Sequence, residues 1–296
     1  MFRSHLIRAL ALAFACGLAL PATAQERRPS HCIAIADAAP GVNWFDHAAV
    51  ADPQEAQPAA FGSPLADAWS VRLNYVAHAT FLLETAQGLT AATDYTGFLG
   101  TTALVPDVVT MNHAHETHWT AHPDPAIPHV LRGWGDAAGP PAEHWLDLEH
   151  MIIRNVTTDI RSRWEADSVE KDGNSIFIFE VGGLCIGHLG HLHHEPSEAQ
   201  YAAIGRLDVV MAPVDGGMTL DTATLLRMMA RMKASVVIPM HWFGGLTLQE
   251  FLDGMSDGFD ISRPGSSHIE LSLRDLPARP TVVVLEPRWL RDPDDT

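Results

Sequence analysis

Positive charge is scarce in this 296-residue chain, which carries 19 Lys and Arg residues against 36 Asp and Glu residues. Only two of the cations are lysines, Lys171 and Lys233. Proteins that bind nucleic acids or anionic membranes use clustered positive charge to displace counterions, and no such cluster is visible. The net formal charge of −17 therefore argues against a nucleic-acid partner and favours a small-molecule substrate.

Long apolar runs are also missing, because no stretch beyond residue 24 approaches the roughly 18 apolar residues that span a membrane. The one marked run, Ala9–Leu20, is shorter, follows two arginines and leads into Ala22-Thr23-Ala24. This pattern predicts a secretory signal peptide over residues 1–24, cleaved after Ala24, with an uncleaved anchor as the alternative. We therefore expect a periplasmic or secreted protein without stable membrane insertion.

Cysteines are few as well, and one of the three, Cys16, lies inside the apolar run. The processed chain would keep Cys32 and Cys185, which could pair in an oxidising compartment, but two cysteines alone leave the pairing open. With 47% hydrophobic and 19% charged residues, the chain has the composition of a folded protein and not of a disordered tail or a coiled coil.

The sequence changes character near residue 70. Residues 25–70 are rich in Ala, Pro and acids and predict an irregular N-terminal extension, whereas residues 71–296 are expected to form one domain. Strands are expected at Val71–Val76, Thr80–Thr85, Leu89–Thr93, Val108–Met111, Met151–Val156, Ser175–Val181, Leu184–His188, Leu207–Met211, Ser235–Ile238, Ile269–Leu273 and Thr281–Leu285. Helices are expected at Ser197–Ile204, from an Asp221 cap through Met232, and at Thr247–Met255, with surface loops over residues 119–149. Strands that later alternate with helices predict an α/β fold, with sheets covered by helices.

Histidine is abundant, since the chain has 17 and eight of them lie in two short windows, 113–122 and 188–194. His113 and His115 lie two residues apart, so in an extended segment their side chains project to the same side. His118 follows about one helical turn later. These three side chains can reach one cavity and bind one metal ion.

A second set of histidines follows two other predicted strand ends. His188 and His191 flank Gly190, which permits a sharp turn beside a ligand, and His241 follows Pro239 after a strand. Strand-end loops often carry site residues, and imidazole is the commonest metal ligand. The candidate metal ligands are therefore His113, His115, His118, His191 and His241, with His188 as a weaker candidate.

Four neighbouring residues have open roles. Asp94 ends a predicted strand and either orients a ligand histidine or only closes a turn. His78 could touch the site from a strand turn, although a hydrogen-bonding role is expected for it. His193 and His194 follow the second turn and are expected to be solvated.

Six stretches follow one another in an order and spacing known from one superfamily: Asn74–Leu82, Thr93–Tyr95, Asn112–His118, Gly183–Gly190, Asp208–Gly217 and Val237–His241. Over residues 71–285 the chain resembles the metallo-β-lactamase fold superfamily, and within it the L-ascorbate-6-phosphate-lactonase-like hydrolases. The resemblance implies an αββα sandwich with one or two metals, usually zinc, along one edge of two sheets. It also implies a metal-bound hydroxide that hydrolyses lactones, lactams, esters or phosphodiesters.

Three positions depart from the pattern of that family. The motif H-x-H-x-D-H has Thr117 in place of the aspartate, and the family's Gly-Asp pair is Gly190-His191 here. The family's middle histidine is missing near Asp159, which could substitute for it. Because two lost carboxylates leave two cations poorly compensated, one zinc ion is expected, with another divalent transition metal as the alternative.

In such a hydrolase, zinc lowers the pKa of its water to about 7. Glu116 and Asp215 are the nearest carboxylates by motif and either relay a proton or have structural roles, and the Thr117 hydroxyl could hydrogen-bond the water. The main hypothesis is an exported metal-dependent hydrolase of a small ester, lactone or phosphoester. The alternative is a non-catalytic or degenerate member that binds metal for structure, sensing or storage.

The substrate is less defined by the sequence. Tryptophans in or beside the loops expected to form the site predict either an apolar wall or ordinary core packing: Trp119, Trp134, Trp145, Trp164 and Trp242. Arginines of the middle segment could hold one anionic group: Arg132, Arg154, Arg161 and Arg163.

Overall fold

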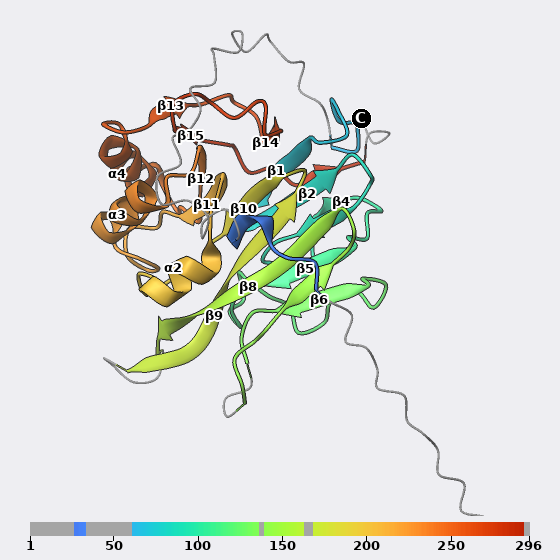
Figure 1. Cartoon of the computed structure of the whole chain (residues 1–296), viewed down its shortest axis with the longest axis horizontal. Coiled ribbons are helices and arrows are strands. Elements are labelled where there is room, and N and C mark those ends of the chain that lie inside the picture. The colour runs from blue at the N-terminus through green and yellow to red at the C-terminus, as the bar shows by residue number, and fades with distance from the viewer. Residues whose placement is uncertain (1–26, 34–60, 136–138, 163–167, 293–296) are drawn as a thin grey trace, which may run out of the picture.

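The computed structural model of the chain describes residues 27–33, 61–135, 139–162 and 168–292. The expected signal peptide and most of the expected N-terminal extension lie outside these residues. Within them, two β-sheets form the body of the molecule (Figure 1). The described helices are all too short or too polar to cross a membrane.

The first sheet has six strands in the order β14-β1-β2-β3-β5-β6. Its members are β14 (His268–Leu271), β1 (Val71–Ala77), β2 (Thr80–Thr85), β3 (Thr90–Ala92), β5 (Val108–Met111) and β6 (His129–Arg132). The β1–β2 and β2–β3 pairs are antiparallel, whereas β3, β5 and β6 run parallel. The carboxyl ends of β3 and β5 therefore lie at the same edge as the turn between β1 and β2.

The second sheet has eight strands in the order β13-β15-β12-β11-β10-β9-β8-β7. Its members are β13 (Asp260–Ser262), β15 (Thr281–Val283), β12 (Val236–Met240), β11 (Val209–Pro213), β10 (Leu184–His188), β9 (Val169–Val181), β8 (Met151–Arg161) and β7 (Trp145–Asp147). Strands β10, β11 and β12 are parallel and fully buried, as expected for sheet strands covered on both faces. A short pair, β16 (Leu290–Arg291) with β4 (Gly100–Thr101), lies apart from both sheets.

Three helices cover the outer face of the eight-stranded sheet, and Figure 1 shows them together beside β11 and β12. They are α2 (Glu198–Ile204), α3 (Thr222–Met232) and α4 (Gly245–Met255). The side chains of Ser197 and Asp221 cap the first two, accepting hydrogen bonds from backbone N–H groups of the first turn. Both caps stand where the sequence predicts a helix start.

The two packed sheets and the helices on one side match the α/β sandwich expected from the sequence, and the layer on the other side differs. One apolar cluster lies between the two sheets and includes Phe81, Phe177 and Met211. The outer face of the six-stranded sheet carries another, in which Tyr95, Ile127 and other loop residues cover the strands. In the described residues this outer layer is made of loops, where the family pattern implies helices.

One segment differs from the sequence-based expectation, and another has contacts that the sequence left open. Residues 119–149 contain the short strands β6 and β7 in addition to loops. Residues 27–33 pack against the domain, because the Cys32–Cys185 disulfide joins this segment to β10. Ser30 and Cys32 are both buried there. The pairing that the sequence left open is thus present in the structure.

Candidate metal centre

Loops at one edge of the sandwich bring the expected histidines together. His113 and His118 follow β5, His191 follows β10, and His241 follows β12. Strands of both sheets end at this edge, so side chains from distant parts of the sequence meet. The imidazole rings form a connected set in which neighbouring ring centroids are 3.9 to 6.4 Å apart.

His118 lies at the centre of this histidine cluster and is fully buried. Its Nε2 atom is 3.1 Å from Nε2 of His241 and 3.1 Å from Nδ1 of His191. Two nitrogens bound to one zinc at tetrahedral geometry lie roughly 3.3 Å apart, given Zn–N bonds of about 2.0–2.1 Å. Each of these two separations fits a pair of imidazole nitrogens that bind one metal cation.

Carboxylates hold two of these rings from behind. Asp94 Oδ2 is 2.5 Å from Nδ1 of His118, and Asp215 Oδ2 is 2.9 Å from Nδ1 of His241. A carboxylate on one ring nitrogen fixes the orientation of the ring and directs the other nitrogen to a metal. Asp94 thus contacts a candidate ligand histidine, one of the two roles that the sequence left open for it, and Asp215 has the same position behind a second histidine.

His113 and His115 are oriented in a similar way by uncharged oxygens. Nδ1 of His113 is 2.6 Å from the Gly173 carbonyl, and Nδ1 of His115 is 3.1 Å from the Thr117 hydroxyl. Both rings lie against His191, with centroids 5.5 and 5.4 Å away. The Thr117 hydroxyl thus supports a candidate ligand, at the position where the family pattern has an aspartate.

Burial disfavours the charged form of several rings of the cluster. Burial, followed by the nearby His241 ring, lowers the pKa of His118 well below its ordinary value. Burial also lowers the pKa of both His78 and His193 to about 3. Burial raises the pKa of Asp215, but the bonds from His241, Thr219 and Gly217 outweigh it and hold the pKa below the ordinary value. Neutral imidazoles backed by an ionised carboxylate are the forms that bind metals.

His188 lies outside the cluster of facing nitrogens. Its Nδ1 atom is 3.2 Å from Asn112 Nδ2 and its Nε2 atom is 2.8 Å from the Ala79 carbonyl, so both ring nitrogens have hydrogen-bond partners. His188 therefore links the two sheets instead of facing the other histidines. Gly190, as expected, makes a sharp turn with φ +60°, and a Cβ there would lie 1.9 Å from Asn112 Nδ2.

The other candidate site residues are placed as follows. Glu116 is exposed beside the cluster. Asp215 accepts bonds from the Gly217 and Thr219 N–H groups as well as contacting His241, so it is held in a positioning role. Asp159 pairs with Lys171 and does not replace the missing histidine.

The candidate substrate residues mostly have other contacts. Arg154 is buried against Glu180, and Arg161 donates to three carbonyls of residues 217–219. Trp119 and Trp134 pack edge to face on the outer side of the six-stranded sheet, and Trp242 packs into the core. Residues 163 and 164 lie outside the described residues. Arg132, at the end of β6, is exposed and keeps its candidate role.

Two further histidines, which the sequence did not predict as metal ligands, lie in the cluster. His78, in the β1–β2 turn, lies with its ring centroid 3.9 Å from that of His241. His193 lies 4.6 Å from His191, and its Nδ1 accepts a hydrogen bond from the Arg161 N–H. His78 lies far from the other ring residues in sequence, so only the folded chain brings it to the site. His193 follows His191 by two residues, and its Nε2 atom is buried instead of solvated as expected.

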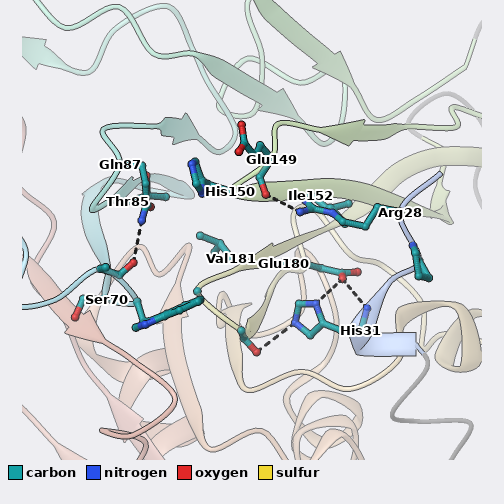
Figure 2. A pocket seen from close by; sticks show the side chains of 15 residues that line it. Arg28, His31, Ser70, Thr85, Gln87, Glu149, His150, Ile152, Glu180 and Val181 are labelled. Atoms are coloured by element: carbon teal, nitrogen blue, oxygen red, sulfur yellow. Dashed lines mark hydrogen bonds and ion pairs between the residues drawn. The ribbon is translucent and has the colours of Figure 1, made fainter. Parts of the chain in front are cut away.

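A cavity of about 340 Å³ lies at the opposite end of the sandwich (Figure 2). Its polar groups are bonded to one another: Arg28 donates to the Glu149 carbonyl, and His31 contacts both Glu180 and the Gly183 carbonyl. The nearby cysteines are joined in the disulfide and cannot act as thiolate ligands. The histidine cluster is therefore the stronger candidate site.

Comparison with known proteins agrees with this placement. Residues 72–241 match a family model described as "Beta-lactamase superfamily domain". These residues run from β1 to His241 and include all of the cluster described above.

Individual relatives extend the comparison. The chain is 26% identical over 203 residues to a UPF0173 metal-dependent hydrolase of Methanosphaerula palustris, covering 64% of this chain and 92% of the relative. A candidate Zn-dependent hydrolase of the metallo-β-lactamase superfamily from Thermotoga maritima is similar in structure, with a TM-score of 0.50 and 25% identity over 74% of this chain and all of that one. Igni18, a metallo hydrolase from Ignicoccus hospitalis, shares the fold at TM-score 0.50 and 18% identity, covering 69% of this chain and 99% of its own.

Proposed function

The chain belongs to the beta-lactamase superfamily, whose domain model matches residues 72–241. We propose that it is a metal-dependent hydrolase and that the histidine cluster holds the metal. One observation carries the proposal: His118 Nε2 lies 3.1 Å from a nitrogen of both His241 and His191, with carboxylates behind His118 and His241. His113 and His115 lie against His191 and are further candidate ligands.

The donor set suggests which metal binds. Imidazole nitrogens suit zinc and other late divalent transition metals, whereas magnesium and calcium require oxygen ligands. A neutral hydroxyl at Thr117 and an imidazole at His191 leave little negative charge to compensate two cations. We therefore propose one zinc ion per chain.

The bound metal would supply Lewis acidity and lower the pKa of a water molecule to about 7. The chain's own residues orient and shield the reaction. Asp94 and Asp215 hold the rings of His118 and His241, and Thr117 holds His115. Glu116 is exposed beside this site and is the proposed proton acceptor, because Asp215 is committed to His241 and two backbone N–H groups.

We propose a small ester, lactone or phosphoester as the substrate class. Exposed apolar side chains follow His241 and flank Asp215: Phe243, Leu246 and Met218 are 65%, 88% and 54% exposed. The Phe243 ring lies 5.5 Å from that of His241. This rim favours substrates with an apolar group next to the bond that is hydrolysed.

Export is a further part of the proposal. The Cys32–Cys185 disulfide supports it, because disulfides persist mainly in oxidising compartments. The basic residues and apolar run within residues 1–24 support it as well.

Thr117 and His191 stand where the family has carboxylates, and this change favours a second candidate function. In that case the protein is a member of the family that binds metal without catalysis. Turnover of metal-free and zinc-reloaded protein on an aryl ester, a lactone and a phosphodiester separates the two. We expect zinc-dependent hydrolysis that His241→Asn abolishes and His150→Ala, on the exposed far end, leaves intact. Bound zinc without turnover would favour the non-catalytic member, and turnover that survives metal removal would contradict the metal mechanism.

A further inference from the structure

The turn between β1 and β2 directs an additional histidine at the cluster. His78 adopts φ +45°, in the left-handed region that non-glycine residues rarely occupy. Its carbonyl accepts hydrogen bonds from the His241 N–H at 2.9 Å and from the Tyr75 hydroxyl at 2.7 Å. His241 itself has φ +63°. Two strained residues are thus bonded to each other, which is typical of functional sites.

The side chain of His78 has no conventional role. Its Nε2 atom is buried and has no hydrogen-bond partner within the described part of the chain. A buried polar atom without a partner destabilises the fold, so a structural role alone does not account for a histidine there. The expected hydrogen-bonding role of His78 is therefore absent for this nitrogen.

The neighbours of the His78 ring are two rings of the cluster that carboxylates orient, His118 and His241. One nitrogen from each of His78, His118 and His241 lies within 4.8 Å of the other two. The Phe243 ring lies 5.2 Å from that of His78 and covers it. Asp94 and Asp215 orient the rings of His118 and His241, which are already candidate ligands. His78 is the one member of this group of three that the ligand set did not yet include.

We propose that His78 is a metal ligand, which completes a three-histidine position with His118 and His241. Three imidazoles bind zinc and similar transition metals and leave a coordination position open for water or substrate. His78 would then add a donor to a site in which Thr117 stands at the family's aspartate position. This inference rests on the proposal that the cluster binds a metal, but not on the reaction that the metal supports.

Cobalt(II) is a suitable probe because it enters zinc sites and gives visible absorption bands that report its ligands. The full-length protein, stripped of metal, is titrated with Co²⁺ alongside two variants, His78→Asn and His150→Ala. Asparagine tolerates the positive φ of residue 78, so the turn should persist, and near-ultraviolet circular dichroism checks the fold. We expect His78→Asn to weaken Co²⁺ binding by about tenfold or more and to shift the bands, with His150→Ala unchanged.

A rescue experiment separates ligation from a structural effect. His78→Gly also accepts the positive φ and opens a space, so added imidazole should restore its Co²⁺ affinity without changing that of the wild type. If wild-type protein binds Co²⁺ and His78→Asn binds it with the same affinity and spectrum, His78 is not a ligand. If the wild type binds no metal at all, the proposed function falls together with this assignment.

Discussion

The two ends of the sandwich handle polar groups in opposite ways. At the cavity end, Figure 2 shows Glu180 accepting hydrogen bonds from His31. Glu180 also accepts hydrogen bonds from Ser30 and Arg154, and the disulfide joins the neighbouring Cys32 and Cys185. At the histidine end, the backbone of His78 is strained and its Nε2 lacks a partner in the described structure.

The backbone shows the same difference. Of the six described non-glycine residues with positive φ, three lie in or behind the histidine cluster, His78, Asp94 and His241, whereas one, Glu149, lines the cavity. Satisfied polar networks stabilise a fold, whereas strain and unpaired polar atoms persist where a ligand is bound. The comparison assigns stability to the cavity end and metal binding to the histidine end.

The largest expected effect on stability comes from the disulfide. Replacing both cysteines, Cys32→Ser with Cys185→Ser, releases residues 27–33 from β10 and should lower the free energy of unfolding by about 2–5 kcal/mol. Urea denaturation of oxidised wild type and the double variant measures the change. Metal affinity should stay the same, and a matching loss of Co²⁺ binding would show that the two ends are not independent.

The next effect concerns Glu180 and acid. Burial raises its pKa, but hydrogen bonds from His31, Arg154 and Ser30 outweigh burial and lower the pKa to about 2, from an ordinary 4.5. A carboxyl with a depressed folded-state pKa stabilises the protein above the unfolded-state value, and this contribution disappears as pH falls from 4.5 towards 2. The shift corresponds to at most about 3 kcal/mol.

Glu180→Gln tests this prediction. Its stability deficit relative to wild type, measured in urea, should be largest near neutral pH and shrink between pH 4.5 and about 2. Adding Arg154→Met to the variant removes the buried charge that would otherwise be left unpaired. If the variant is less stable than wild type by the same amount at pH 7 and pH 3, the ionised Glu180 carboxylate is not the cause of the difference.

Substitution of Asp215 should affect metal binding strongly and the stability of the fold only slightly. Asp215→Asn keeps an acceptor oxygen for the Gly217 and Thr219 N–H groups but weakens the hold on His241, so metal affinity should fall about 10- to 100-fold with little change in stability. Co²⁺ titration measures the loss. Asp221→Asn is the matched control, because asparagine also caps helices and α3 lies outside the cluster. Equal affinities of the two variants would remove Asp215 from the site.

The smallest effect belongs to Arg28. Its ion pair with Asp147 is 2.7 Å long but substantially exposed, and such pairs contribute about 0–1 kcal/mol. Arg28→Ala should therefore change the urea midpoint only slightly and leave Co²⁺ binding intact. A loss larger than about 2 kcal/mol would mean that the N-terminal segment depends on this residue more than on the disulfide.

The sequence predicts the interior of the fold well. Strands β2, β5 and β10 have the expected bounds, and the helix caps at Ser197 and Asp221 stand where expected. These elements are signalled by apolar runs and by local turn chemistry. Strands β6 and β7 are short, lie at sheet edges and are only partly buried, so their residues lack a clear apolar pattern.

The site was predictable to a similar degree. Spacing within one loop identified His113, His115 and His118, and strand ends identified His191 and His241, all of which the structure brings together. The position of His188 was harder to predict, because its side chain turns between the sheets to Asn112 and Ala79. The place of His78 depends on a positive φ in a tight turn, and the disulfide joins residues 153 apart; neither feature is encoded by local spacing.

Metal content tests the central claim most directly. Elemental mass spectrometry of the full-length protein, purified from an oxidising compartment and dialysed, counts the ions that remain bound. The account predicts about one zinc ion per chain, lost in His118→Ala and kept in His150→Ala. Less than about 0.1 transition-metal ion per chain, even after reconstitution with zinc, would contradict a metal centre at the histidine end.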